Sequence, residues 1–421
     1  MKKRSVVLTA AATAALMLSG CTSGSSTGAS SDGKVTISFA HWGNNQENAT
    51  LKAMVALFEK AHPDITVRSN WVQSDYEQKL QTSIAGGSAP TVAAISHTSL
   101  PAFASAFRKA EVQPSDYYSP NISRSMSVGG AYAATPFTVK TKAMAVNKKL
   151  YRKAGLTVPS ANSPMTPEQF AANAAKLTSG SGKSRVFGSA PLWFQGWLSV
   201  EGGSFYNADG TRCASGSPTA VKTAEYIIDA QSPKGFTPSY LGAQGQDMFD
   251  WLSIGRLAMQ PDFGPWNIAQ LTALSNSADY ALVPVPGRGE PMEVDGLGIS
   301  RSAGGAQADA AQKFVRFMAT DPGAQKLLTT KASSLGLPVV EAALPSFEAA
   351  APDLDLKVFV DAVDQSVVTA TPKQDTQAQS TFNNDMFSRT AMGSGHEAPA
   401  VVLPQLQKKC QQTLDSAGAG Q

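Results

Sequence analysis

The chain has 421 residues, of which 42% are hydrophobic and 16% are charged, and its formal net charge is +3. Three of the positive charges (Lys2, Lys3 and Arg4) stand at the extreme N-terminus, so the side-chain charge of the remainder is near zero. This balance argues against a nucleic-acid partner and against a basic membrane-binding face. The part from about Lys34 onward is too long for one ordinary core, so we expect two domains or lobes.

The N-terminal segment has the pattern of a secretion signal. Its basic start precedes an apolar stretch from Val6 to Leu18 that is too short to span a bilayer. The stretch ends in Leu18-Ser19-Gly20-Cys21, which resembles the lipobox of bacterial lipoproteins, where cleavage before the cysteine exposes it for lipidation. We therefore predict a signal peptide over residues 1–20, a lipid on Cys21, and a Gly/Ser-rich flexible linker within residues 21–33. The alternative is a soluble secreted protein that is cut nearby.

The first part of the folded chain alternates strands with helices. Residues 35–39 alternate apolar and polar side chains, which predicts a half-buried strand. A helix with Leu51, Met54, Val55 and Phe58 on one face follows, and residues 62–64 break it before a second strand begins at residue 65. A short helix ending at residues 86–87 and a third strand over residues 91–96 complete the pattern. Strand, helix, strand, helix, strand predicts a parallel α/β sheet.

The middle of the chain continues in the same style. Helix starts are indicated at Thr166-Pro167 and Ser217-Pro218, and another helix ends at Gly255. Residues 280–286 form a short strand interrupted by prolines, which is typical of a segment crossing between lobes. After it comes a helix that Asp321-Pro322 terminates. Two cysteines remain after Cys21, at positions 213 and 410; they can pair in an oxidising compartment, and the sequence leaves the pairing open.

Complete catalytic signatures are missing from the sequence. The four histidines are scattered, and no paired-cysteine pattern indicates a metal site. Aromatic residues in polar loops are the more informative feature: Trp42 follows a predicted strand, Trp193 opens a ring-rich segment, and Trp266 stands in a Gly-Pro turn. A flat ring beside hydrogen-bonding groups suits a sugar, although the commoner role of any single tryptophan is core packing.

Several segments in the right order resemble one family, the extracellular solute-binding proteins of ABC importers, in the carbohydrate branch related to maltose-binding protein. They are Phe58 to Val67, Tyr76 to Pro90, Ala145 to Leu156, Gly255 to Met259 with Gly264-Pro265-Trp266, and Val283 to Pro286 with Asp295 to Ser300. After Pro90 the family usually has Asp-Val, whereas this chain has Thr91-Val92. The resemblance covers nearly all of the chain that follows the leader.

The resemblance implies two α/β lobes joined by about three crossings, with the ligand in the cleft between them. Lobe one would comprise residues 34–137 and 287–335, and lobe two residues 138–286 and 336–421. The crossings would fall near Pro136–Lys140, Pro284–Gly287 and Gly336–Val339. The lobes would close on the solute as rigid bodies.

The function implied is capture of a solute outside the cytoplasm, on the outer face of the cell membrane, and its delivery to an ABC permease. Few charges in the candidate loops favour a neutral solute, and the rings favour a mono- or oligosaccharide. We expect a monomer without catalytic residues, metal or cofactor. A lipoprotein glycosidase or a solute sensor using the same cleft remains the alternative. The residues expected to contact the solute are Trp42, Asn44, Ser96, His97, Thr138, Trp193, Phe194, Asp262, Trp266, Asp295 and Gly296.

Overall fold

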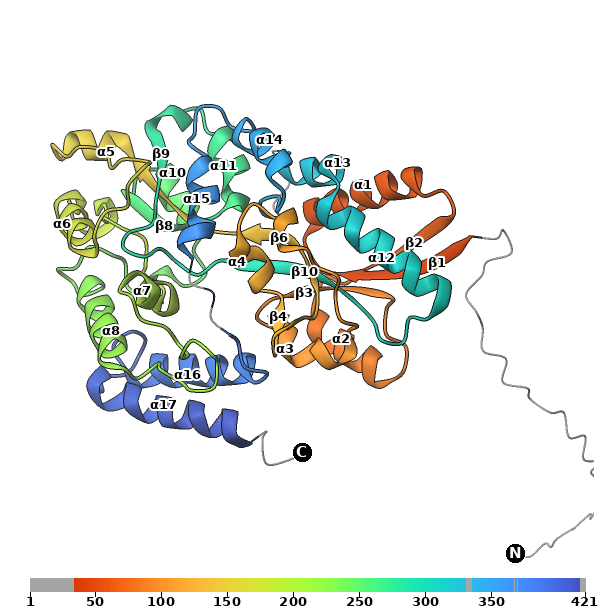
Figure 1. Ribbon diagram of the computed structural model, residues 1–421. Helices are drawn as coiled ribbons and strands as arrows, with labels where there is room; N and C mark the ends of the chain where they lie inside the picture. Colours follow the sequence, from red (N-terminus) through yellow and green to blue (C-terminus); the bar gives the residue numbers. More distant parts are fainter. Residues whose placement is uncertain (1–33, 331–334, 367, 369, 417–421) are drawn as a thin grey trace, which may run out of the picture.

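The computed structural model describes residues 34–330, 335–366, 368 and 370–416. The predicted signal peptide, Cys21 and the linker lie outside these residues. The described chain forms two lobes, with β1, β2 and α12 in one and α6, α8 and α17 in the other (Figure 1). Within the described residues, no helix combines the length and the apolar character needed to cross a membrane.

The strands are β1 (Val35–His41), β2 (Ile65–Trp71), β3 (Val92–Ser96), β4 (Ser127–Val128), β5 (Ala131–Tyr132), β6 (Thr135–Lys140), β7 (Ala143–Asn147), β8 (Met259–Phe263), β9 (Tyr280–Val283) and β10 (Glu293–Ile299). The α-helices are α1 (Asn45–Ala61), α2 (Tyr76–Ala85), α3 (Leu100–Phe103), α4 (Pro120–Arg124), α5 (Lys148–Lys153), α6 (Pro167–Leu177), α7 (Phe194–Val200), α8 (Pro218–Ala230), α9 (Tyr240–Ala243), α10 (Met248–Ser253), α11 (Ile268–Ala273), α12 (Gly305–Thr320), α13 (Pro322–Lys326), α14 (Leu344–Glu348), α15 (Lys357–Gln365), α16 (Asp375–Arg389) and α17 (Pro399–Ser416).

Lobe one is built on a mixed sheet. Within the described residues, five strands form it in the order β2-β1-β3-β10-β6. β1 pairs in parallel with both β2 and β3, as the alternation of strands and helices predicts, whereas β10 returns antiparallel between β3 and β6. The structure therefore confirms the predicted fold class, an α/β fold with two lobes.

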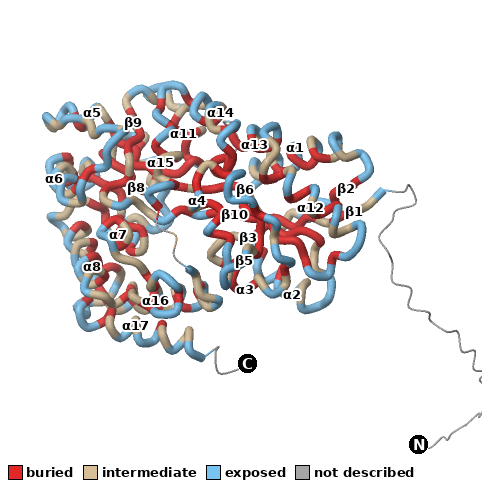
Figure 2. Tube along the Cα trace, viewed as in Figure 1, coloured by how far each residue is buried: buried red, intermediate tan, exposed pale blue. Residues whose placement is uncertain are grey.

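The core of lobe one lies between this sheet and helices α1 and α12. Phe58 on α1 and Phe314 on α12 meet edge to face with ring centroids 5.1 Å apart, and Phe314 meets Phe39 of β1 at 5.2 Å. All three rings are fully buried. Each such side chain contributes about 1.5–3 kcal/mol by leaving water. Figure 2 shows the buried residues running along β1, β3 and β10 beneath the exposed outer faces of the helices.

Lobe two is built around a smaller antiparallel sheet. Within the described residues, its three strands have the order β8-β7-β9. Helices α6, α7, α8, α16 and α17 contribute to its core, where Phe170 and Trp197 meet at 4.8 Å. A disulfide joins Cys213 to Cys410 of α17, so the structure resolves the pairing that the sequence leaves open. This bond fastens the C-terminal helix to the middle of the chain.

Short segments carry the chain between the two sheets. Thr141 and Lys142 connect β6 to β7, and residues 284–292 connect β9 to β10. Farther on, Leu337 pairs with Val139 of β6 before the chain continues through α14 and α15 to α16, which packs beside α17 in lobe two. One cluster of buried apolar side chains includes Val139 and Val294 of the first sheet together with Ala143 and Leu282 of the second. The lobes thus share apolar packing where the chain crosses.

Candidate functional site

One edge of the five-stranded sheet gathers polar side chains from several strands. β1 and β3 run parallel, so Trp42 and His97 both follow carboxyl ends that meet at this edge. β10 begins here, which places Asp295 opposite Ser96. The carboxyl end of β6 arrives at the same edge, where Lys140 Nζ donates to Asp295 Oδ2 over 2.8 Å. Carboxyl edges of open α/β sheets are common ligand sites.

A cavity of about 430 Å³ opens on this edge within lobe one. We call it the lobe-one cavity; its lining includes Trp42, Asp75, Tyr76, Glu77 and Ser96. The Trp42 ring lies 5.0 Å from the Tyr76 ring, and the Tyr76 hydroxyl donates to the carbonyl oxygens of residues 40 and 94. The predicted residues Trp42 and Ser96 therefore do come together, with the tryptophan held by a fixed tyrosine.

A second cavity, of about 280 Å³, is lined from both lobes. We call it the interlobe cavity. His97, Thr98 and Glu293 contribute from lobe one, and Lys142 and Glu290 contribute from the crossing segments. Lobe two supplies the rest of the lining: Gln195, Gly196, Ser199, Gly203, Ser204, Phe205, Tyr206, Thr371, Asp375 and Gln379, with Pro291 and Met292 of the crossing. Hydroxyl, amide and carboxylate groups thus surround one space between the lobes.

An ion-pair triad lies where the crossings meet lobe two. Lys142 Nζ lies 2.6 Å from Asp262 Oδ1 and 3.0 Å from Glu290 Oε2. Burial alone would lower the pKa of the Lys142 ammonium, but the two carboxylates overcome this effect and raise it. Burial also raises the pKa of Glu290, against the opposing influence of Lys142. The Glu290 carboxyl rests against Gly196 of α7, where a Cβ would come within 2.7 Å of it.

His97 is locked in place at the lobe-one side of the interlobe cavity. Its backbone N–H donates to the Val294 carbonyl, and its Nδ1 accepts from the Val294 N–H over 3.1 Å. Nε2 is left to carry the proton of the neutral ring. Burial lowers the pKa of His97, although Glu293, Asp295 and Asp375 act in the opposite direction. The ring is therefore uncharged at neutral pH and serves as a hydrogen-bonding group.

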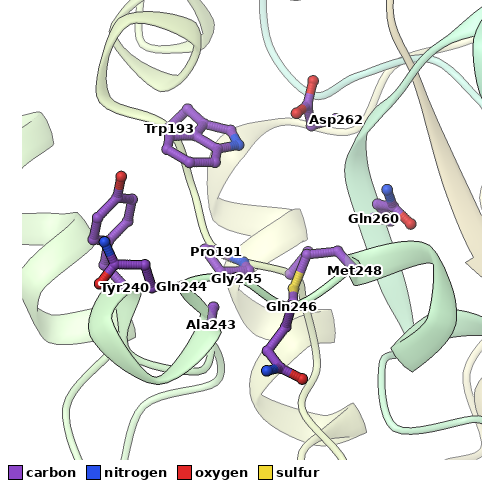
Figure 3. A pocket seen from close by; sticks show the side chains of 11 residues that line it. Pro191, Trp193, Tyr240, Ala243, Gln244, Gly245, Gln246, Met248, Gln260 and Asp262 are labelled. Carbon is purple, nitrogen blue, oxygen red and sulfur yellow. The ribbon is translucent and has the colours of Figure 1, made fainter.

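A third cavity, of about 200 Å³, lies within lobe two next to the triad (Figure 3). We call it the lobe-two cavity; Trp193, Tyr240, Met248, Gln260 and Asp262 are among its lining residues. Trp193 and Tyr240 meet edge to face at 5.4 Å, and Trp193 remains 44% exposed. An exposed ring beside amide and carboxylate groups is the arrangement that suits the C–H face of a sugar.

Other predicted residues have contacts elsewhere. Phe194 is buried and stacks on Phe382, so it packs in the core. The buried Thr138 hydroxyl donates to the Leu337 carbonyl over 2.9 Å. Asn44 is the N-cap of α1, where its side chain accepts from the N–H groups of residues 46 and 47. Each of these side chains is explained by packing or capping instead of by lining the three cavities.

Two further predicted residues, one after β8 and one within β10, have close contacts that account for them. Trp266 is 37% exposed and its ring folds over Gly264, where a Cβ would come within 2.3 Å of ring atoms. It follows the end of β8, four residues after Asp262, but does not line the three cavities. Gly296 lies in β10 at a register shift beside Asp295, and a Cβ there would meet the sulfur of Met126 at 2.5 Å. Close packing therefore explains this glycine.

Sequence reasoning missed Lys142, Glu290, Asp375 and Tyr240. Lys142 and Glu290 stand next to segments that the sequence predicts as crossings between the lobes. A charged side chain in or beside such a segment is the feature that could have identified them as site residues. Asp375 occupies the first turn of α16, where an acidic residue is expected for helix stability alone. Among the described residues, no group of three histidine, cysteine, aspartate or glutamate side chains is arranged to hold a metal ion.

Two lobes with a cavity lined from both define the architecture of a solute-binding protein. The chain belongs to the family of bacterial extracellular solute-binding proteins, whose model matches residues 42–325. No curated protein sequence matches it. The resemblance to this family is thus confirmed.

Solved structures share the fold over nearly the whole chain. The ABC substrate-binding protein Lmo0181 of Listeria monocytogenes, in complex with cycloalternan, is 22% identical with a TM-score of 0.76, covering 91% of this chain and 99% of its own. The GacH receptor of Streptomyces glaucescens, solved unliganded and with acarbose, is 24% identical with a TM-score of 0.72, covering 90% and 98%. The sugar-binding protein MalE of Xanthomonas citri is 20% identical with a TM-score of 0.74, covering 91% and 98%.

Proposed function

We propose that this protein captures a mono- or oligosaccharide in the cleft between its lobes and delivers it to the permease of an ABC importer. The observation that carries the proposal is the interlobe cavity, which is lined by side chains of both lobes and of the crossings. The sugar ligands of the proteins with the same fold support a sugar as the solute. Exposed Trp193 and half-buried Trp42 offer ring faces on the two lobes.

The chemistry of the lining suits a polyol. The amides of Gln195 and Gln379 and the hydroxyls of Ser199 and Ser204 can both donate and accept. Sugar hydroxyls need such paired donors and acceptors, because a buried hydroxyl without a partner costs free energy. Trp42 lines the lobe-one cavity and Trp193 the lobe-two cavity, so these rings cover apolar faces of a sugar that extends from the interlobe cavity toward them.

Capture follows from lobe closure. A sugar that contacts His97 from lobe one and Asp375 from lobe two stabilises the arrangement in which both are near. The segments around Thr141–Lys142 and residues 284–292 then serve as hinges, and the lobes as rigid bodies. The closed form presents both lobes to the permease. No bond of the sugar is broken in this cycle.

We also propose that a lipid on Cys21 tethers the protein to the outer face of the cell membrane, with the linker that follows it as a spacer. A diacylated cysteine supplies the two chains that stable anchoring needs.

A thermal-shift screen against mono- and oligosaccharides tests the function. A sugar at 100 times its Kd adds about 2.7 kcal/mol to the free energy of unfolding, which raises Tm measurably. We expect one class of sugar to raise Tm and to remain chemically intact after incubation. A screen in which amino acids or peptides raise Tm and no sugar does would contradict the proposal, as would steady product formation that copurifies with the protein.

A further inference from the structure

The lobe-two cavity has a largely apolar wall. Its lining includes Ala190, Pro191 and Met248 together with the rings of Trp193 and Tyr240. An apolar cavity of about 150 Å³ accommodates benzene, so the space of about 200 Å³ here has room for one six-membered ring or a ring substituent. A sugar hydroxyl buried against such a wall without a partner costs free energy. The wall therefore favours a part of the solute that carries an apolar group.

One buried polar side chain interrupts this apolar wall. Gln260 of β8 is only 6% exposed, and its Oε1 has no hydrogen-bond partner among the described residues. An unpaired buried acceptor costs free energy that a donor on a bound molecule can recover. Gln260 stands across the cavity from Trp193 (Figure 3), and the broad terminal torsion of a glutamine lets the amide turn its oxygen toward such a donor. The cavity thus combines an unsatisfied acceptor with apolar groups.

The aromatic side of the cavity is held in place by packing. Tyr240 stacks on Phe387 of α16 with ring centroids 4.3 Å apart, and it meets Trp193 edge to face. Trp193 therefore keeps a fixed position although 44% of it is exposed. A ring fixed in this way covers the C–H face of one sugar ring and leaves the substituents of that ring to reach the opposite wall.

The lobe-two cavity adjoins the interlobe cavity through the ion-pair triad. Asp262 lines the lobe-two cavity and pairs with Lys142, which lines the interlobe cavity. Trp193 and Gln195, two residues apart in the chain, likewise line one cavity each. A solute held between the lobes can therefore extend one ring, or a substituent of that ring, into the lobe-two cavity.

We propose that the solute is an N-acetylated sugar whose acetamido group lies in the lobe-two cavity, with its N–H donating to Gln260 Oε1 and its methyl group against Met248. This inference rests on the proposed function. An amide N–H only donates, as the single unpaired acceptor requires, whereas a hydroxyl there also presents lone pairs that the apolar wall leaves without a partner. The methyl group gains free energy by leaving water. The amide carbonyl can accept from the exposed side chain of Gln244 or Gln246.

Matched sugars test the acetamido group directly. N-acetylglucosamine, N-acetylgalactosamine and diacetylchitobiose are titrated by calorimetry, each against its hydroxyl counterpart (glucose, galactose, cellobiose) and its free-amine counterpart. Fucose and rhamnose, which carry a methyl group without an amide, complete the series. We expect at least one acetylated sugar to bind about tenfold or more tightly than both of its counterparts and than either deoxy sugar, because only the acetylated sugar supplies both the donor and the methyl group.

Variants locate the effect. Gln260→Met keeps the length of the side chain and removes an unpaired oxygen, so it should fold normally. We expect it to reduce the preference for the acetylated sugar severalfold while the hydroxyl sugars bind as before. Met248→Gln, which puts a polar group against the methyl, should reduce the preference as well and tests the position a second time. Gln412→Met, at an exposed position of α17 in the same lobe, is the control and should leave the preference unchanged.

The outcomes separate this inference from the proposed function. Hydroxyl, amine or deoxy sugars that bind as tightly as the acetylated ones would overturn the inference and leave sugar capture standing. A preference for the acetylated sugar that survives in both variants would overturn the assigned position. Failure of every sugar to bind, in this series and in the thermal-shift screen, would overturn the proposed function as well.

Discussion

Replacing Lys142 with methionine removes the cation of the triad and keeps most of the side chain's length. The Glu290 side chain is only 6% exposed, so the change strands a carboxylate in a low-dielectric site. Breaking a buried ion pair in this way costs about 3–5 kcal/mol. The side chains of Lys142 and Asp262 are 23% and 32% exposed, so the ion pair between them resembles a surface pair. It contributes about 0–1 kcal/mol to the free energy of unfolding. Because Lys142 is itself 23% exposed, we expect Lys142→Met to fall at the low end of the range for a buried pair and to lower the free energy of unfolding by about 3 kcal/mol at neutral pH.

The loss should depend on pH in a definite direction. Burial raises the pKa of Glu290 above its ordinary value, so the folded state binds this proton more tightly than the unfolded state does. Such a group contributes stability at low pH that disappears as pH rises through the folded-state pKa. Without the Lys142 ammonium the pKa of Glu290 moves higher still. The difference in stability between the variant and the parent should therefore be small near pH 5 and larger near pH 8.

Urea unfolding at both pH values, without sugar, measures this difference. Lys149→Met, at an exposed position seven residues along the chain, is the control and should change the free energy of unfolding by less than about 0.5 kcal/mol. A Lys142→Met variant that behaves like the control, or one whose deficit is larger at pH 5 than at pH 8, would refute the reasoning about the triad.

Four further outcomes follow from the structure and the proposals. Trp42→Ala and Trp193→Ala should each weaken sugar binding by about 1–3 kcal/mol, ten- to a hundredfold in Kd by calorimetry, with a normal melt; an unchanged Kd would remove that ring from the site. Replacing Cys213 and Cys410 by serine removes a disulfide between residues 197 positions apart. The chain-entropy relation predicts that the free energy of unfolding falls by about 5 kcal/mol, observed as a lower urea midpoint; equal midpoints would show that the bond does not contribute to stability. Cys21→Ser should move the protein from the membrane fraction to the medium; retention in the membrane would place the anchor elsewhere. Saturating sugar should reduce the radius of gyration in small-angle scattering; superimposable curves would exclude closure.

The helices and strands could be predicted because the sequence patterns that specify them span only a few residues. The apolar face of α1 and the helix start at Thr166-Pro167 are encoded within a few residues, and both are present as predicted. The antiparallel β10 between β3 and β6 is different, because its neighbours lie far away in the sequence. Periodicity shows that a strand exists but does not specify its partners.

The site could be predicted only in part, because sequence patterns do not show which distant segments come together in the fold. Trp42 and His97 follow strand ends and Ser96 is the last residue of β3, and parallel strands imply the sheet edge at which these residues gather. Phe194 stands beside Trp193 in the sequence, yet the helical turn that exposes one ring buries the other. Asp375 reaches the cavity from α16, on a part of the chain whose position depends on packing throughout lobe two.

A crystal structure with the sugar that raises Tm most tests the central claim most directly. The account predicts electron density for the sugar in the interlobe cavity, in contact with His97 of lobe one and Asp375 of lobe two, with the lobes closed around it. A sugar seated outside the space between the lobes, or contacts with one lobe alone, would contradict it.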